Sequence, residues 1–156
     1  MALNKAPRTY FIEPMTAADI DEVVDIERAS FRSAWAREVF VEELNRDLAR
    51  IDIVRADDGG PIAAFANYWL VSDEVHLLNL ATHPLERRQG HACRLLTHLI
   101  EFARRENCHC ITLEVRRSNS EAIRVYRRFA FRAIGVRPNY YADEHEDAIV
   151  MLMELT

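Results

Sequence analysis

The chain has 156 residues, of which 49% are hydrophobic, and this size and composition are typical of one globular domain with a single core. Its 20 basic and 25 acidic side chains leave a net charge of −5, which argues against binding DNA or RNA through bulk electrostatics. No run approaches the roughly 18 apolar residues that span a bilayer, and residues 1–5 lack the apolar core of a secretory signal. We therefore expect a cytoplasmic protein with neither a nucleic-acid nor a membrane partner.

Hydrophobic periodicity and turn residues divide the chain into strands and helices, with no linker between two domains. The expected strands cover residues 10–12, 51–55, 62–71, 75–81, 111–115, 131–136 and 148–155. The expected helices cover residues 17–30, 36–48, 92–107 and 120–129, and residues 137–147 are expected to form a polar, aromatic loop. This order predicts an α/β (α+β) fold over residues 1–156: one domain with a mixed central sheet of about six to seven strands and about four flanking helices.

A basic turn joins the strand at residues 75–81 to the next helix, and it reads Arg87-Arg88-Gln89-Gly90-His91-Ala92. The first amides of a helix lack intrahelical acceptors, and the aligned peptide dipoles leave partial positive charge at that end. A phosphate group is therefore a suitable ligand for this turn. The sequence has neither a Walker A motif nor a Gly-x-Gly-x-x-Gly fingerprint, so another phosphate-bearing ligand is expected.

The basic turn resembles the pyrophosphate loop Gln/Arg-x-x-Gly-x-Gly/Ala of the GNAT-fold acyl-CoA-dependent N-acetyltransferases. The preceding segment, residues 78–84, is similar to the splayed fourth strand of that family. Three further blocks are similar to the RimI-type ribosomal-protein-alanine N-acetyltransferases: Leu113-Glu114-Val115-Arg116-Arg117-Ser118-Asn119, then Ala122-Ile123 with Tyr126, and the closing residues Asn139-Tyr140-Tyr141 and 146–151. Together these blocks cover most of the chain from Glu74 onward.

The resemblance implies a GNAT fold and an acetyl-CoA-dependent enzyme that transfers the acetyl group directly within a ternary complex. It further implies that the acceptor is the N-terminal α-amine of a protein, such as the N-terminal alanine of a small-subunit ribosomal protein. Implied cofactor-binding residues are Leu80, Ala81, Thr82, Arg87, Arg88, Gln89, Gly90, His91, Ala92, Asn119 and Tyr126. Implied acceptor-binding residues are Trp35, Asn79, Tyr140 and Tyr141.

The acceptor half departs from the family pattern more than the cofactor half. Residues 31–35 retain Trp35 but lack both flanking prolines, and the Gly-Phe pair of the family is Ala130-Phe131 here. The loop after Tyr141 is shorter and more acidic. Three alternatives therefore stay open: an acetyltransferase for a small amine, one for another peptide, and a CoA-binding regulatory module without catalysis.

Glu114 is the candidate general base, acting directly or through water. An α-amine has a pKa of about 7.7 to 8.0, so a modest base near neutral pH suffices to supply the neutral nucleophile. Glu114 lies on the polar side of its strand, opposite Leu113 and Val115, and partial shielding from solvent is expected to raise its pKa. The alternative is an ordinary solvated strand glutamate.

Tyr126 is the candidate general acid. A phenol with a pKa of about 10 stays protonated at neutral pH and can protonate a departing thiolate, whose conjugate acid has a pKa near 8.5. Taken without the surrounding motif, Tyr126 would be a core residue beside Ile123 and Phe129. Asn119 has two compatible roles, capping the helix that carries Tyr126 and hydrogen-bonding the cofactor.

The three cysteines do not form a disulfide framework and are expected to be reduced. Cys108-His109-Cys110 falls short of the four ligands at recognised spacings that zinc sites require. No metal site is therefore predicted from the sequence.

Overall fold

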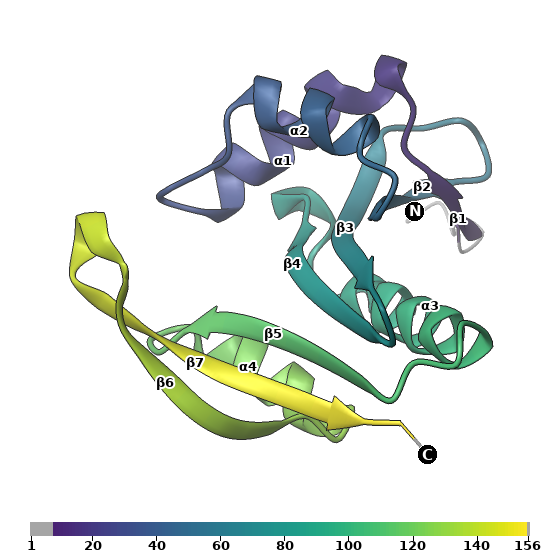
Figure 1. Ribbon diagram of the computed structural model, residues 1–156. Helices are drawn as coiled ribbons and strands as arrows, with labels where there is room; N and C mark the ends of the chain where they lie inside the picture. The colour runs from purple at the N-terminus through teal and green to yellow at the C-terminus, as the bar shows by residue number, and fades with distance from the viewer. Residues whose placement is uncertain (1–7, 156) are drawn as a thin grey trace, which may run out of the picture.

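The computed structural model describes residues 8–155 (Figure 1), so residues 1–5, where no secretory signal is expected, lie outside the described range. One seven-stranded mixed sheet has the order β1-β2-β3-β4-β5-β7-β6. Its strands are β1 (Tyr10–Pro14), β2 (Ala49–Ala56), β3 (Ile62–Val71), β4 (Glu74–Thr82), β5 (Cys110–Arg116), β6 (Arg132–Tyr141) and β7 (Glu146–Glu154). The expected mixed sheet is confirmed, and within residues 8–155 only β4 and β5 pair in parallel.

In the described part of the chain, four α-helices cover the two faces of this sheet, namely α1 (Ile20–Ser30), α2 (Arg37–Leu44), α3 (His91–Arg105) and α4 (Ser120–Arg128). Alternate residues of β3 separate two hydrophobic clusters: Ala64 and Ala66 pack with α3 and α4, whereas Phe65 packs with α1 and α2. Because successive strand side chains point to opposite faces, the two helix pairs lie on opposite sides of the sheet. Among the described residues, no helix is both long and apolar enough to cross a membrane.

Two expected boundaries are wrong. The helix expected at residues 36–48 ends at Leu44, where Asn45 turns its side-chain amide back to the carbonyl of Val41 at 3.0 Å. The loop expected at residues 137–147 is mostly strand, because β6 extends to Tyr141 and β7 begins at Glu146. Since β6 is an edge strand, Pro138 removes no ladder hydrogen bond that the sheet needs.

Strands β4 and β5 are paired at one end and diverge toward the other, which sets where the neighbouring elements lie. Their parallel pairing runs from Glu74 opposite Cys110 to Leu77 opposite Leu113. Opposite β3, the register of β4 shifts at the same place, so Leu78 is an extra residue. An extra residue reverses which face the following side chains occupy. Val75 and Leu77 pack on the α3 side, whereas Ala81 packs on the α1 side.

Candidate active site

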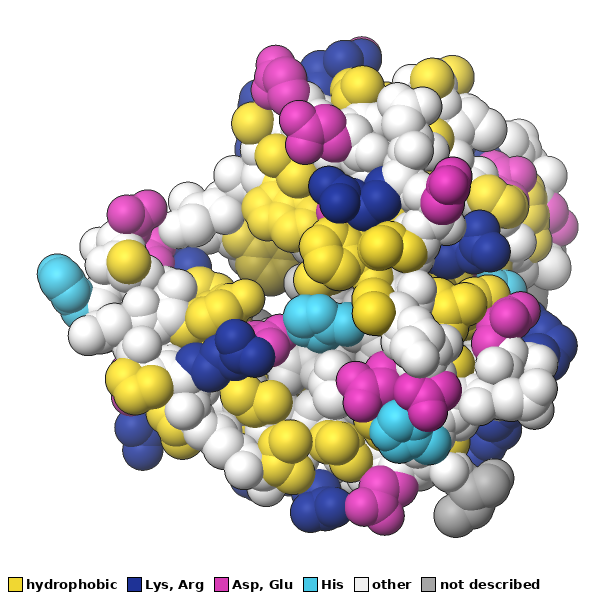
Figure 2. All heavy atoms as spheres, in the orientation of Figure 1, with side chains coloured by type: hydrophobic (Ala, Val, Ile, Leu, Met, Phe, Trp, Pro, Cys, Tyr) yellow, Lys and Arg dark blue, Asp and Glu magenta, His cyan; other side chains and the backbone are white. Residues whose placement is uncertain are grey.

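A cleft of about 480 Å³ opens where β4 leaves β5. Its walls come from the end of α1 and the turn after it, the diverging strands, α4 and the β6–β7 hairpin. Figure 2 shows a hollow between the arm formed by this hairpin and the rest of the molecule, with hydrophobic side chains along one wall. Eight predicted site residues line the cleft: Trp35, Asn79, Leu80, Glu114, Asn119, Tyr126, Tyr140 and Tyr141.

Glu114 lies on β5 at the edge of this cleft, with a side chain that is 9% exposed. Its Oε2 is 2.6 Å from Nε2 of His76 on β4, and its Oε1 is 3.5 Å from the guanidinium of Arg137 on β6. The expectation of a raised pKa is wrong: the hydrogen bond with His76 holds the pKa of Glu114 below its ordinary value, although burial opposes this. The carboxylate is therefore ionised at neutral pH.

Tyr126 reaches the cleft from the other face of the sheet, on α4. Asn119 caps this helix by accepting a hydrogen bond from the amide of Ala122 at 3.2 Å, so the predicted capping role is confirmed. The ring of Tyr126 is 8% exposed and packs edge-on against Phe131 at 5.7 Å between centroids. Burial raises the pKa of Tyr126 above that of a free phenol, so the hydroxyl keeps its proton at neutral pH.

Glu27 is a cleft residue that the sequence reasoning missed. Its side chain is 1% exposed, accepting a hydrogen bond from Asn79 Nδ2 at 2.9 Å and another from the backbone amide of Trp35 at 2.8 Å. Burial raises the pKa of Glu27, while these two hydrogen bonds act in the opposite direction. The extra residue at Leu78 turns Asn79 toward α1, and the helical apolar spacing around Glu27 gave no signal of such a contact.

Polar contacts through Arg116 and Glu144 hold the tip of the β6–β7 hairpin against both sides of the cleft. Nη1 of Arg116 is 2.9 Å from Glu144, whose other oxygen accepts a hydrogen bond from Ser33 at 3.2 Å in the turn after α1. The guanidinium of Arg116 lies 3.9 Å from the ring centroid of Tyr141. Burial raises the pKa of Tyr141 to about 12 although Arg116 lowers it. These contacts place Tyr140 and Tyr141 on the α1 side of the opening, together with Trp35.

The basic turn lies at the start of α3, outside the residues that line the cleft. Gly90 is the N-cap residue with φ +80°, and Arg88 also has a left-handed φ of +63°. No side chain within residues 8–155 caps this helix end, which leaves its first amides available to an anion. His91 was predicted to bind the cofactor, but it is 1% exposed, and its ring centroid lies 4.5 Å from that of Tyr10. Only the backbone of His91 therefore faces the turn. The other predicted residues outside the cleft lining are Ala81, Thr82, Arg87, Gln89 and Ala92.

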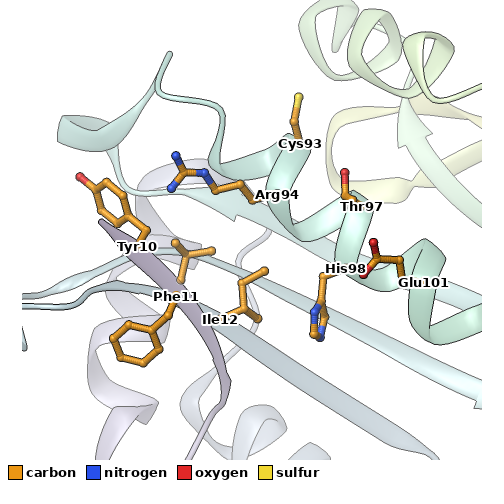
Figure 3. A pocket seen from close by; sticks show the side chains of 9 residues that line it. Tyr10, Phe11, Ile12, Cys93, Arg94, Thr97, His98 and Glu101 are labelled. Carbon is orange, nitrogen blue, oxygen red and sulfur yellow. The ribbon is translucent and has the colours of Figure 1, made fainter. Parts of the chain in front are cut away.

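A second, shallower groove lies between β1 and α3 (Figure 3). It is larger, at about 610 Å³, and its walls include Tyr10, Ile12, Arg94 and His98. None of the predicted site residues lines it. Size therefore does not decide between the two, whereas the convergence of ionisable groups makes the β4–β5 opening the candidate site.

Comparisons with known proteins agree with this geometry. The sequence profile of the Acetyltransferase (GNAT) family matches residues 20–131. The chain is 31% identical over 147 residues to the ribosomal protein bS18-alanine N-acetyltransferase of Escherichia coli K12, covering 93% of this chain and 97% of that protein. A Bacillus subtilis strain 168 protein that is provisionally named for the same activity is 33% identical over 141 residues, covering 90% and 92% of the two chains.

The solved structures give the same fold. The crystal structure of the E. coli ribosomal-protein-S18-alanine N-acetyltransferase superposes with a TM-score of 0.86 at 31% identity and covers 95% of each chain. Ard1 from Thermoplasma volcanium has a TM-score of 0.86 at 24% identity, covering 94% of this chain and 98% of that one, and it supports the fold alone. The chain belongs to the GNAT family of acetyltransferases, enzymes that take the acetyl group from acetyl-CoA.

Proposed function

We propose that this protein acetylates the N-terminal α-amine of a protein, with acetyl-CoA as cosubstrate, and that its acceptor is the N-terminal alanine of a small-subunit ribosomal protein. The E. coli relative, named for bS18-alanine acetylation, supports this acceptor at 31% identity. Residues 1–156 then act as one catalytic domain in the cytoplasm, where ribosomal proteins are made.

The observation that carries the proposal is that Glu114 and Tyr126 line one cleft from opposite faces of the sheet. The opening between β4 and β5 joins the two faces, so two reactants can approach from different sides and meet between these side chains. This arrangement suits direct transfer in a ternary complex, because each reactant has its own route and the reacting atoms are brought together.

The residues on the α4 side fit acetyl-CoA. The uncapped start of α3, with Arg87 and Arg88, suits the pyrophosphate of the cosubstrate. The strand segment Leu80–Thr82 continues past its last pairing with β5 and suits the amide-bearing pantetheine arm, with Asn119 and Ala122 across the cleft. The cosubstrate supplies a thioester, whose carbonyl carbon accepts the amine and whose sulfur leaves.

The residues on the α1 side suit a cationic peptide terminus. Glu27 and Glu114 line this side, and Glu146 is near the opening beside Tyr141. An α-ammonium group that enters here meets the ionised carboxylate of Glu114, while Trp35, Tyr140 and Tyr141 offer apolar walls to the first side chains. A small first residue such as alanine is consistent with a cleft of about 480 Å³ that both reactants share.

The proposed chemistry needs three proton transfers. Glu114, directly or through one water, takes a proton from the α-ammonium, and the neutral nitrogen then forms a bond to the carbonyl carbon. The carbon–sulfur bond breaks, and Tyr126 gives its phenolic proton to the sulfur, so that free CoA leaves as a thiol. The nitrogen then loses its surplus proton to the Tyr126 phenolate, directly or through water, which leaves a neutral amide, and Glu114 releases its proton to solvent. The lowered pKa of Glu114 keeps its carboxylate ionised so that it can act as a base, and the raised pKa of Tyr126 keeps its hydroxyl protonated so that it can act as an acid.

A peptide panel tests the function. Purified protein is mixed with acetyl-CoA and peptides that begin with alanine, the same peptides with a blocked N-terminus, and a set of small amines, and free thiol is followed. We expect thiol release with the free alanine peptides alone. Release with a small amine only would favour the small-amine alternative, and CoA binding without release on any acceptor would favour a regulatory module.

A further inference from the structure

Glu74, His109 and Cys110 form a cluster at the opposite end of β4 and β5 from the active-site cleft. One ligand-type atom from each side chain lies within 4.8 Å of the other two. Sheet register makes this contact, because Glu74 is paired directly with Cys110 at the first position of the parallel ladder. In sequence Glu74 is far from His109, so the Cys-His-Cys segment alone could not indicate that Glu74 joins this cluster.

The donor atoms suit a borderline divalent cation. The cluster offers one sulfur, one imidazole nitrogen and one carboxylate oxygen, which are the ligands that Zn²⁺ favours. Nε2 of His109 is 3.4 Å from Oε1 of Glu74, and two ligands about 2.1 Å from a tetrahedral zinc ion lie roughly 3.4 Å apart. The Cys110 side chain is 3% exposed, whereas about half of the Glu74 and His109 side chains is exposed, so an ion has an entry path from solvent.

A fourth residue orients the histidine. Oδ2 of Asp73 is 2.9 Å from Nδ1 of His109, which places the ring proton on Nδ1 and leaves Nε2 free as a ligand. A carboxylate on the far nitrogen of a metal-binding histidine is the usual supporting contact in zinc sites. The histidine of the cluster is thus already oriented for a metal, which distinguishes the cluster from polar groups that merely lie near one another at a surface.

We propose that Glu74, His109 and Cys110 bind one Zn²⁺ ion, with water as the fourth ligand and Asp73 as the positioning residue. Binding forms a bond between zinc and the Cys110 sulfur, and the thiol proton leaves to solvent. Because the thiol proton must leave when the sulfur binds the metal, binding strengthens as pH rises. The ion would tie together the first residues of the parallel strand pair, whose later divergence forms the cleft. The site is separate from the proposed acetyl transfer, which it neither requires nor explains.

Cobalt substitution tests the site. Tag-free full-length protein is titrated with Co²⁺, and the expected result is one equivalent bound with a strong sulfur-to-cobalt charge-transfer band that Zn²⁺ removes. Cys110→Ser should abolish the band. His109→Ala and Glu74→Gln should weaken binding at least tenfold, and Asp73→Asn should weaken it about 10- to 100-fold. Cys93→Ser and His145→Ala, which change residues outside the cluster, should leave the titration unchanged.

The exposed position of His109 keeps the test decisive even if the buried Cys110 variant folds poorly. The proposal is overturned if wild-type protein gives no charge-transfer band, or if the band and affinity persist in His109→Ala. A thermal unfolding midpoint that rises with Zn²⁺ in wild type but not in His109→Ala would support it independently. Thiol-release activity is measured on the same samples, so failure of the metal site and failure of the proposed function are read separately.

Discussion

Nε2 of His76 and Oε2 of Glu114 are 2.6 Å apart, and they join β4 to β5 at the point where the two strands begin to separate. The contact is diagonal, because the register partner of His76 is Thr112. It lowers the pKa of Glu114 and holds one oxygen of its carboxylate against the imidazole. His76 thus acts on the candidate base from a neighbouring strand.

Replacing His76 should move the acid side of the pH–rate profile. In His76→Ala the hydrogen bond that lowers the pKa of Glu114 is gone, although Arg137 at 3.5 Å remains. The pKa of Glu114 therefore rises, the carboxylate is protonated at higher pH, and the acid limb of kcat should shift to higher pH. Glu114→Gln should lower kcat by about 10²–10⁴-fold at all pH values. An acid limb that stays in place in His76→Ala would show that Glu114 does not govern it.

Tyr126→Phe should separate catalysis from folding. Phenylalanine keeps the ring that packs on Phe131, so the unfolding temperature should change little, whereas the proton donor is lost. We expect kcat to fall by about 10²–10⁴-fold, with CoA affinity nearly unchanged. Thiol release, calorimetric CoA binding and thermal unfolding are measured together. Unchanged turnover would remove Tyr126 from the role of acid, while the fold and family assignment would stand.

The buried carboxylate of Glu27 should make stability depend on pH in a predictable direction. Its folded pKa is raised from 4.5, so the native state holds the proton more tightly than the unfolded chain. The resulting stabilisation is fully present below the unfolded pKa and is lost as pH rises through the folded pKa. The free energy of unfolding of wild type in urea should therefore exceed that of Glu27→Gln by a margin that shrinks as the pH rises above 4.5. An advantage that is constant or grows with pH would contradict the raised pKa.

Arg116→Lys should weaken acceptor binding specifically. Lysine keeps the charge, but it lacks the planar group that stacks on Tyr141 at 3.9 Å and bonds to Glu144 at 2.9 Å. We expect KM for the peptide to rise about fivefold, since such a contact contributes about 1 kcal/mol, with KM for acetyl-CoA unchanged. Arg117→Lys is the matched control, because that side chain is 68% exposed beside Asp147. Equal effects of the two variants would argue against a role for the hairpin contact in acceptor binding.

Much of the fold could be predicted because periodic apolar residues report directly on burial. The order of strands and helices and the polar side of β5 that carries Glu114 were predicted from the sequence. Strands were predicted at residues 131–136 and 148–155, but the extension of β6 to Tyr141 was not, because Pro138, Asn139 and the polar residues after them are typical of loops. An edge strand tolerates these residues, and Asn139 has a left-handed φ of +52° where the β6–β7 register is irregular.

The residues of the candidate site could be predicted from the sequence only where they lie in a recognisable motif. Glu114, Asn119 and Tyr126 lie in matched blocks. In contrast, strand register brings His76 and Arg137 to Glu114, and the bulge in β4 turns Asn79 toward Glu27 in the cleft. The extra residue at Leu78 turns Asn79 toward Glu27, and no residue type in β4 indicates this bulge. The lowered pKa of Glu114 follows from the same cause, since a diagonal contact between strands cannot be deduced without their register.

The central claim is tested most directly by finding which nitrogen receives the acetyl group. A peptide with a free N-terminal alanine and an internal lysine is incubated with the protein and acetyl-CoA, then sequenced by fragment-ion mass spectrometry. The account predicts one acetyl group, on the α-nitrogen of the alanine, and none on the lysine. Acetylation of the lysine, or no acetylation by protein that binds CoA, would contradict it.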